Sequence, residues 1–163
     1  MGITFKEKPV TLSGAQPQTG EKAPSFTVLG TDLSEVTFEA GTKTLISVVP
    51  SIDTSTCDKQ TRTFNEEAAA VENAEIWTIS ADLPFAQRRW CANAGLEGAH
   101  IYSDHKTLDF GTAYGLVIEE LRLLSRAVFV VDSSGTIVYS EIVGEVSGHP
   151  EYDKAIEALK QAD

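Results

Sequence analysis

The fold is decided by the stretch TLISVVP at residues 44–50, a run of apolar and β-branched residues that ends at a proline. Such a run is typical of a central strand that is covered on both faces of a sheet. Residues 58–72 then predict a helix, because apolar side chains recur at helical spacing, at Phe64, Ala68 and Val71. Cys57 stands where the strand has ended and the helix begins, a position at which α/β folds carry functional groups.

The rest of the chain repeats this pattern and then changes it. A second apolar run at residues 75–80 leads into a predicted helix at 83–94, with Pro84 in its first turn and Gly95 at its end. A hairpin is predicted at 3–12, strands at 26–29, 36–38, 99–103, 127–132 and 136–143, and helices at 106–114 and 152–161; the segment 117–124 is ambiguous. This order predicts a thioredoxin-like α/β fold, with a central mixed sheet flanked by helices.

Length and composition narrow the class of protein. A chain of 163 residues without repeats or a linker predicts one domain over residues 1–163, with the hairpin as an extension at 1–13. The net charge of −11 and the scattered basic residues argue against nucleic acid as a partner. No stretch has the length of a membrane-spanning helix, and the N-terminus lacks a signal-peptide core. We therefore expect a cytoplasmic enzyme with no membrane partner.

Cys57 stands in a setting that favours its reactive form. The thiolate is the nucleophilic form of cysteine, and the unpaired N–H groups of a helix N-terminus stabilise it. Thr54, Ser55 and Thr56 offer hydroxyls that can cap the helix, and Pro50 can shield the sulfur on one side. The other interpretation is a buried, inert cysteine. The polar run STCDK at residues 55–59 argues against deep burial.

Three other cysteine chemistries fit the sequence less well. A phosphatase loop fails because Arg62 is one position too close to Cys57. Disulfide exchange of the Cys-x-x-Cys type fails because position 60 is Gln. A cysteine protease needs a histidine base, and the histidines stand in no recognisable context, at His100, His105 and His149.

The second cysteine, Cys91, lies in the helix predicted after the second apolar run. A disulfide with Cys57 would require the helix ends to move, because the two Cα atoms must come within about 7 Å. The alternative is a cysteine packed on the buried face of a short helix, beside Trp90. The residues alone leave both interpretations open.

Two motifs resemble those of a known family. PSIDTSTC at residues 50–57 matches the active-site motif of the peroxiredoxins. SADLPFAQRRWC at residues 80–91 resembles the signature of the bacterial thiol peroxidases, the atypical two-cysteine peroxiredoxins. The similarity continues at AYG (113–115), SRA (125–127) and YD (152–153), and it covers essentially the whole chain, including the N-terminal hairpin.

The resemblance implies a role for each matching residue. Cys57 corresponds to the peroxidatic cysteine, which attacks a hydroperoxide and becomes a sulfenic acid. Thr54 corresponds to the hydroxyl beside the reacting atoms, and Pro50 to the residue that closes the pocket. Arg126 corresponds to the guanidinium that stabilises the thiolate and orients the peroxide; without the resemblance it would be taken for a surface cation. Cys91 corresponds to the resolving cysteine, which forms the disulfide with Cys57.

The resemblance also implies the partners of the reaction. Hydrogen peroxide and alkyl hydroperoxides would be reduced to water and alcohols, thioredoxin would reduce the disulfide, and the chain would be a homodimer. No metal or other cofactor is expected. Two alternatives use the same cysteines. One is a peroxide-sensing switch without fast turnover, and the other is a one-cysteine peroxidase in which Cys91 is merely packed.

Overall fold

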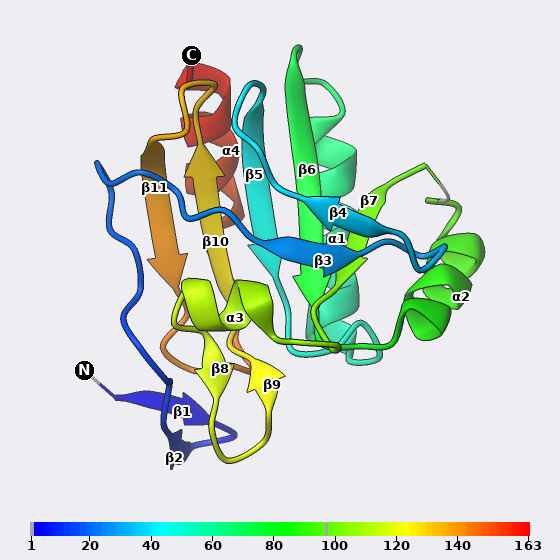
Figure 1. Ribbon diagram of the computed structural model, residues 1–163, viewed down its shortest axis with the longest axis vertical. Coiled ribbons are helices and arrows are strands. Elements are labelled where there is room, and N and C mark those ends of the chain that lie inside the picture. Colours follow the sequence, from blue (N-terminus) through cyan, green and yellow to red (C-terminus); the bar gives the residue numbers. More distant parts are fainter. Residues whose placement is uncertain (1, 97) are drawn as a thin grey trace.

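The computed structural model of the protein describes residues 2–96 and 98–163, and its centre is a mixed seven-stranded sheet (Figure 1). Its strands are β3 (Thr27–Leu29), β4 (Glu35–Thr37), β5 (Lys43–Val48), β6 (Ala74–Ser80), β7 (His100–Ser103), β10 (Ala127–Val131) and β11 (Ile137–Ile142). They lie in the order β11-β10-β5-β6-β7-β3-β4. β5, β6 and β7 are parallel, whereas β10 pairs antiparallel with β5 and with β11. The expected mixed sheet is therefore confirmed.

Helices cover both faces of this sheet. α1 (Ser55–Ala68) and α4 (Tyr152–Gln161) lie together on one face, and the short α3 (Asp109–Ala113) lies on the other (Figure 1). α2 (Pro84–Ala94) packs beside β7. The helices that carry the two cysteines, α1 and α2, each follow a parallel strand of the sheet, so both begin at the same edge.

The apolar residues of β5 explain why it is the central strand. Leu45 packs with Phe64 of α1 and Leu159 of α4, whereas Ile46 and Val48 face the core on the other side of the sheet. Because successive side chains of a strand point to opposite faces, a strand between two helical layers must be apolar on both. The predicted two-sided burial of this strand is confirmed.

Two small sheets lie below the main one in Figure 1. The N-terminal hairpin pairs β1 (Ile3–Phe5) with β2 (Lys8–Val10), and the Glu145 carboxylate binds its turn through the backbone N–H groups of Lys6 and Glu7. The ambiguous segment 117–124 forms a second hairpin, β8 (Val117–Ile118) with β9 (Leu123–Leu124).

Some predicted boundaries are wrong. α1 begins at Ser55 and ends at Ala68, whereas the spacing of apolar residues predicted 58–72. The helix starts earlier because Thr54 caps it, and Val71 packs against the core from beyond its end. α3 is shorter than predicted. Within the part of the chain that the structure describes, no helix has both the length and the apolarity to cross a membrane.

Candidate active site

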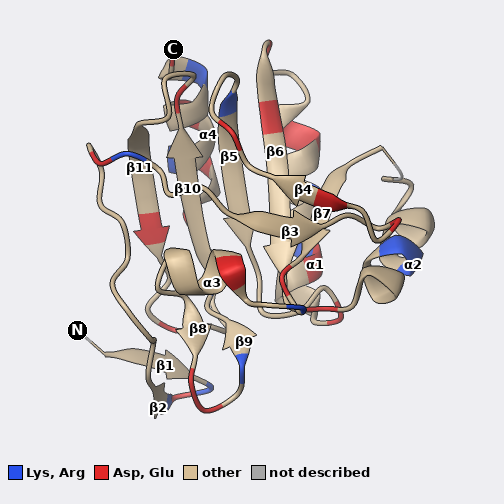
Figure 2. Cartoon of the chain, in the orientation of Figure 1, with Lys and Arg blue, Asp and Glu red and all other residues tan. Residues whose placement is uncertain are grey.

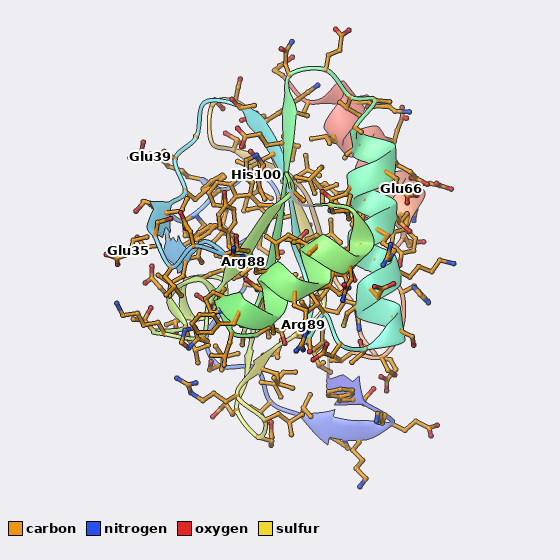
Figure 3. All side chains as sticks on the ribbon, turned by 90° about the vertical axis from the view of Figure 1, so that its right-hand side faces the viewer. Glu35, Glu39, Glu66, Arg88, Arg89 and His100 are labelled. Atoms are coloured by element: carbon orange, nitrogen blue, oxygen red, sulfur yellow. The ribbon has the colours of Figure 1, made fainter. Side chains whose placement is uncertain are left out.

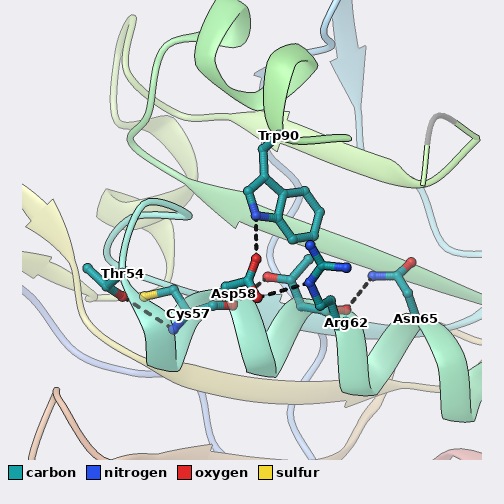
Figure 4. Close-up of polar contacts among 7 residues, drawn as sticks. Thr54, Cys57, Asp58, Arg62, Asn65 and Trp90 are labelled. Atoms are coloured by element: carbon teal, nitrogen blue, oxygen red, sulfur yellow. Dashed lines mark hydrogen bonds and ion pairs between the residues drawn. The ribbon is translucent and has the colours of Figure 1, made fainter. Parts of the chain in front are cut away.

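The loop after β5 places Cys57 in the first turn of α1. Thr54 is the N-cap of this helix, and its Oγ1 accepts a hydrogen bond from the backbone N–H of Cys57 at 3.3 Å (Figure 4). The Cys57 side chain is 0% exposed and packs with Val49 and Ile52. The expectation that polar neighbours would keep Cys57 from deep burial is therefore wrong. Those neighbours lie on the solvent side of the turn, while the sulfur faces the core.

Arg126 lies against the Cys57 sulfur, although the two are far apart in sequence. Its Nη2 lies 3.2 Å from Cys57 Sγ, and the residue is 2% exposed. It precedes β10, which pairs with β5, and this pairing brings the guanidinium to the start of α1. Arg126 is thus no surface cation. A buried guanidinium at this distance can stabilise negative charge that develops beside the sulfur during a reaction.

Gln60 completes the setting of the guanidinium, and the motifs did not indicate it. Its Oε1 accepts from Nη1 of Arg126 at 3.0 Å, while its Nε2 donates to Ser47 Oγ at 2.8 Å. Val146 O accepts from Nε of Arg126 at 2.7 Å. Gln60 is fully buried and stands four residues before Phe64, so both lie on the apolar face of the helix. A polar residue on that face needs a buried hydrogen-bond partner, and this was the signal in the sequence that could have indicated Gln60.

A carboxylate ties the loop before α1 to the loop before α2. Asp82, which follows β6, accepts from Ser51 Oγ at 2.8 Å and from the backbone N–H of Ile52 at 2.9 Å. It also accepts from Ser80 Oγ at 2.6 Å. The loop that leads to Cys57 is therefore held against the end of the neighbouring strand, next to buried Pro50.

Cys91 lies near the C-terminal end of α2 and is 5% exposed. As predicted, Pro84 opens the helix and Gly95 ends it, with φ of 72°. Arg88 and Arg89 lie on its exposed outer face (Figure 3). Cys57 is a free thiol, so no disulfide joins it to Cys91 in this structure.

Tyr152 lies close to Arg126 and Cys57, at the start of α4. Burial raises the pKa of the Tyr152 hydroxyl, and the nearby Cys57 raises it further, whereas Arg126 lowers it. The hydroxyl is hydrogen-bonded to His149 Nδ1 at 2.8 Å. In residues 2–96 and 98–163, no three His, Cys, Asp or Glu side chains are grouped so as to hold a metal ion.

This arrangement can bind and activate a small oxidant at sulfur. Thr54 and Arg126 place a hydroxyl and a cation beside one buried thiol. Fixed groups of this kind stabilise charge that shifts from a sulfur to an oxygen during attack, and they do so without reorganising. The geometry suits a thiol that reacts with a small polar substrate.

Comparison with known proteins identifies the family. The Redoxin family model matches residues 18–156. The chain is 59% identical to the thiol peroxidase of Halalkalibacterium halodurans, over 98% of both chains, and 53% identical to that of Bacillus subtilis, over 97% of this chain and 96% of the relative. The chain belongs to the thiol peroxidase family. The thiol peroxidase resemblance seen in the motifs is thus confirmed, and with it the class of enzyme, a peroxidase.

Solved structures of peroxiredoxin-like proteins have the same fold as this chain. A peroxiredoxin-like protein from Aquifex aeolicus superposes with a TM-score of 0.92 at 34% identity, covering 98% of this chain and 96% of that one. A thiol peroxidase from Chromobacterium violaceum superposes with a TM-score of 0.89 at 20% identity, covering 99% of this chain and 96% of that one. At this identity the similarity shows the fold alone. The expected peroxiredoxin-type fold is confirmed.

Proposed function

We propose that this thiol peroxidase reduces hydroperoxides at Cys57. The Cys57 thiolate attacks the terminal oxygen, the O–O bond breaks, and an S–O bond forms. Cys57 is thereby oxidised to a sulfenic acid, and the released oxyanion takes up a proton to give water or an alcohol. One observation carries the proposal: the Arg126 guanidinium lies 3.2 Å from a fully buried sulfur.

The neighbouring residues are proposed to support this step. Arg126 holds the sulfur as a thiolate and orients the peroxide, and its bond to Val146 O fixes the guanidinium. The Thr54 hydroxyl, already within hydrogen-bond distance of the Cys57 backbone, is placed to bind the peroxide oxygens. Pro50 offers no N–H and closes the pocket on the side of β5.

The cycle is proposed to close through Cys91. Its thiol condenses with the sulfenic acid to give an intramolecular Cys57–Cys91 disulfide, which thioredoxin then reduces by exchange. Such recycling needs a reducing compartment, and this argues for the cytoplasm. All the chemistry lies on the two sulfurs and the supplied dithiol, so the proposed cycle uses no metal or organic cofactor.

The acting unit is proposed to be one domain over residues 1–163, assembled as a homodimer. The charge distribution supports a small substrate rather than nucleic acid. Lys and Arg are scattered among more numerous Asp and Glu (Figure 2), and the net charge is −11. A polyanion would need a clustered basic surface.

The proposal is tested by measuring hydroperoxide consumption with thioredoxin and its reductase. We expect Cys57→Ser to abolish turnover, because no other sulfur lies against Arg126 within the described contacts. We expect Cys91→Ser to form the first sulfenic acid at the normal rate but to lose recycling by thioredoxin. Full turnover in the Cys57 variant would refute the assignment, and normal recycling in the Cys91 variant would refute the resolving role.

A further inference from the structure

Trp90 connects α2 to α1 through a closed set of side-chain contacts. Its indole N–H donates to Asp58 Oδ1 at 2.7 Å, and Asp58 Oδ2 accepts from Arg62 Nε at 2.9 Å (Figure 4). The Arg62 guanidinium carbon in turn lies 5.3 Å from the centre of the Trp90 ring, a cation–π contact. We call these three side chains the Asp58 latch.

The latch adjoins both cysteines in sequence. Asp58 follows Cys57 in α1, and Trp90 precedes Cys91 in α2. The Trp90 ring packs against the buried cluster that contains Cys57. One end of α2 lies beside α1 when the molecule is seen from the side (Figure 3). The latch therefore joins the very turns that carry the two sulfurs.

Disulfide formation would have to break this arrangement. Cys57 and Cys91 are 0% and 5% exposed, and each is fixed in helical backbone. The carbonyl of Cys91 also accepts the backbone N–H of Leu96 in the turn that ends α2. For two buried sulfurs held in helical backbone to meet, we expect one helix end to leave its packing.

We propose that the Asp58 latch sets the rate at which α2 separates from α1, and hence the rate of disulfide formation. Trp90 and Asp58 are then positioning residues, which act on the reaction through Cys91. The inference rests on the proposed Cys57–Cys91 disulfide. In that step the S–O bond of the Cys57 sulfenic acid breaks and an S–S bond forms. The oxygen leaves as water with the proton of the Cys91 thiol.

The strength of the latch suits a contact that opens in every cycle. A hydrogen bond from an indole to a carboxylate is stronger than one between neutral groups. The side chains of Arg62 and Asp58 are, however, 41% and 36% exposed, and solvent weakens their ion pair. The latch thus holds the reduced arrangement in place without making it permanent.

The test compares the two chemical steps in variants that remove one contact each. Trp90→Phe keeps an aromatic ring but lacks the N–H, and Asp58→Asn keeps an acceptor oxygen but loses the charge that binds Arg62. Each variant is mixed rapidly with one equivalent of hydrogen peroxide, and the reaction is quenched at successive times. Mass spectrometry of the quenched samples then gives the rate constants of sulfenic acid formation and of disulfide formation. A pulse of excess peroxide gives the fraction of Cys57 that becomes sulfinic acid, because that reaction competes with disulfide formation.

We expect Trp90→Phe to accelerate disulfide formation roughly tenfold, the effect of losing one hydrogen bond to a charged group. Sulfenic acid formation should stay within about twofold of the wild type by the same scale, because the contacts of Arg126 and Thr54 with Cys57 remain. The sulfinic fraction should fall accordingly. Asp58→Asn should change the same quantities in the same direction.

Glu66→Gln is the matched control, since Glu66 is an exposed carboxylate on the same helix (Figure 3). It should leave both rate constants and the sulfinic fraction at wild-type values. An unchanged or slower disulfide step in both latch variants would overturn the inference, and so would equal changes in both steps, which indicate general loss of structure. A wild-type protein that forms no internal disulfide would instead overturn the proposed function on which the inference rests.

Discussion

At the scale of single residues, the chemistry depends on how the charge of Arg126 is balanced. Its three described acceptors are a carbonyl, an amide and the Cys57 sulfur. A buried cation needs a partner, because desolvation of an isolated charge is costly. In the proposed reaction the Cys57 thiolate would be the counter-ion of Arg126. The neutral amide of Gln60 orients the guanidinium without competing for its charge.

Gln60→Glu tests this balance of charge. A carboxylate at that position would pair with Arg126 and reduce the share of its charge that acts on Cys57. We expect the second-order rate constant of peroxide consumption to fall about tenfold or more, as expected for a loss of ~1.4 kcal/mol. Stopped-flow measurement at neutral pH checks this. Gln60→Leu serves as the uncharged control and should cost more in stability than in rate. Equal rates for wild type and the Glu variant would contradict the argument.

At the scale of elements, the ends of α2 follow directly from local rules. Gly95 has a φ of 72°, and a Cβ at this position would meet no atom within 4 Å. Gly95→Ala would therefore strain only the backbone, at a cost of about 1 kcal/mol in the free energy of unfolding. Urea unfolding monitored by fluorescence measures this cost. Gly98→Ala is a suitable control because its Cβ would also meet open space. A stability unchanged by the Gly95 substitution would argue against the left-handed turn as the end of α2.

The elements that could be predicted are those fixed by local patterns. An apolar run typical of burial on both faces predicted the strand β5, and a proline and a glycine at its ends predicted α2. The predicted bounds of α1 were wrong because any of three adjacent hydroxyl residues could cap the helix. Only packing decides that Thr54 is the cap. The contact of Arg126 with Cys57 depends on strand pairing between β10 and β5, so the family motif and not local sequence indicated it.

At the scale of the whole molecule, one buried carboxyl links stability to pH. Asp104 accepts from the backbone N–H groups of Phe110 and Gly111 at the start of α3, at 2.9 and 2.8 Å. Burial nevertheless raises the pKa of Asp104 from 3.8 to about 6. The folded state thus binds a proton that the unfolded state has already released between these two values. Its stabilising contribution is present below pH 4 and is lost as the pH rises through 6.

Asp104→Asn isolates this contribution. We expect the free energy of unfolding of the wild type, relative to the variant, to fall by about 2–3 kcal/mol between pH 4 and pH 6.5. Chemical denaturation across that range provides the measurement, and taking the difference removes the titration of the other carboxylates. A difference that rises with pH would show that the two backbone hydrogen bonds outweigh burial at this site.

The Asp82 carboxylate has a consequence for how the molecule can move. It accepts from the Ser51 hydroxyl and the Ile52 backbone N–H on one side and from the Ser80 hydroxyl on the other, so the loop that leads to Cys57 is anchored to the end of β6. If α2 shifts in the proposed cycle, these hydrogen bonds can persist, because Asp82 precedes the first residue of α2. The loop that leads to Cys57 could therefore keep its position while α2 moves. In the proposed cycle the reduced site would then re-form against a loop that has stayed in place.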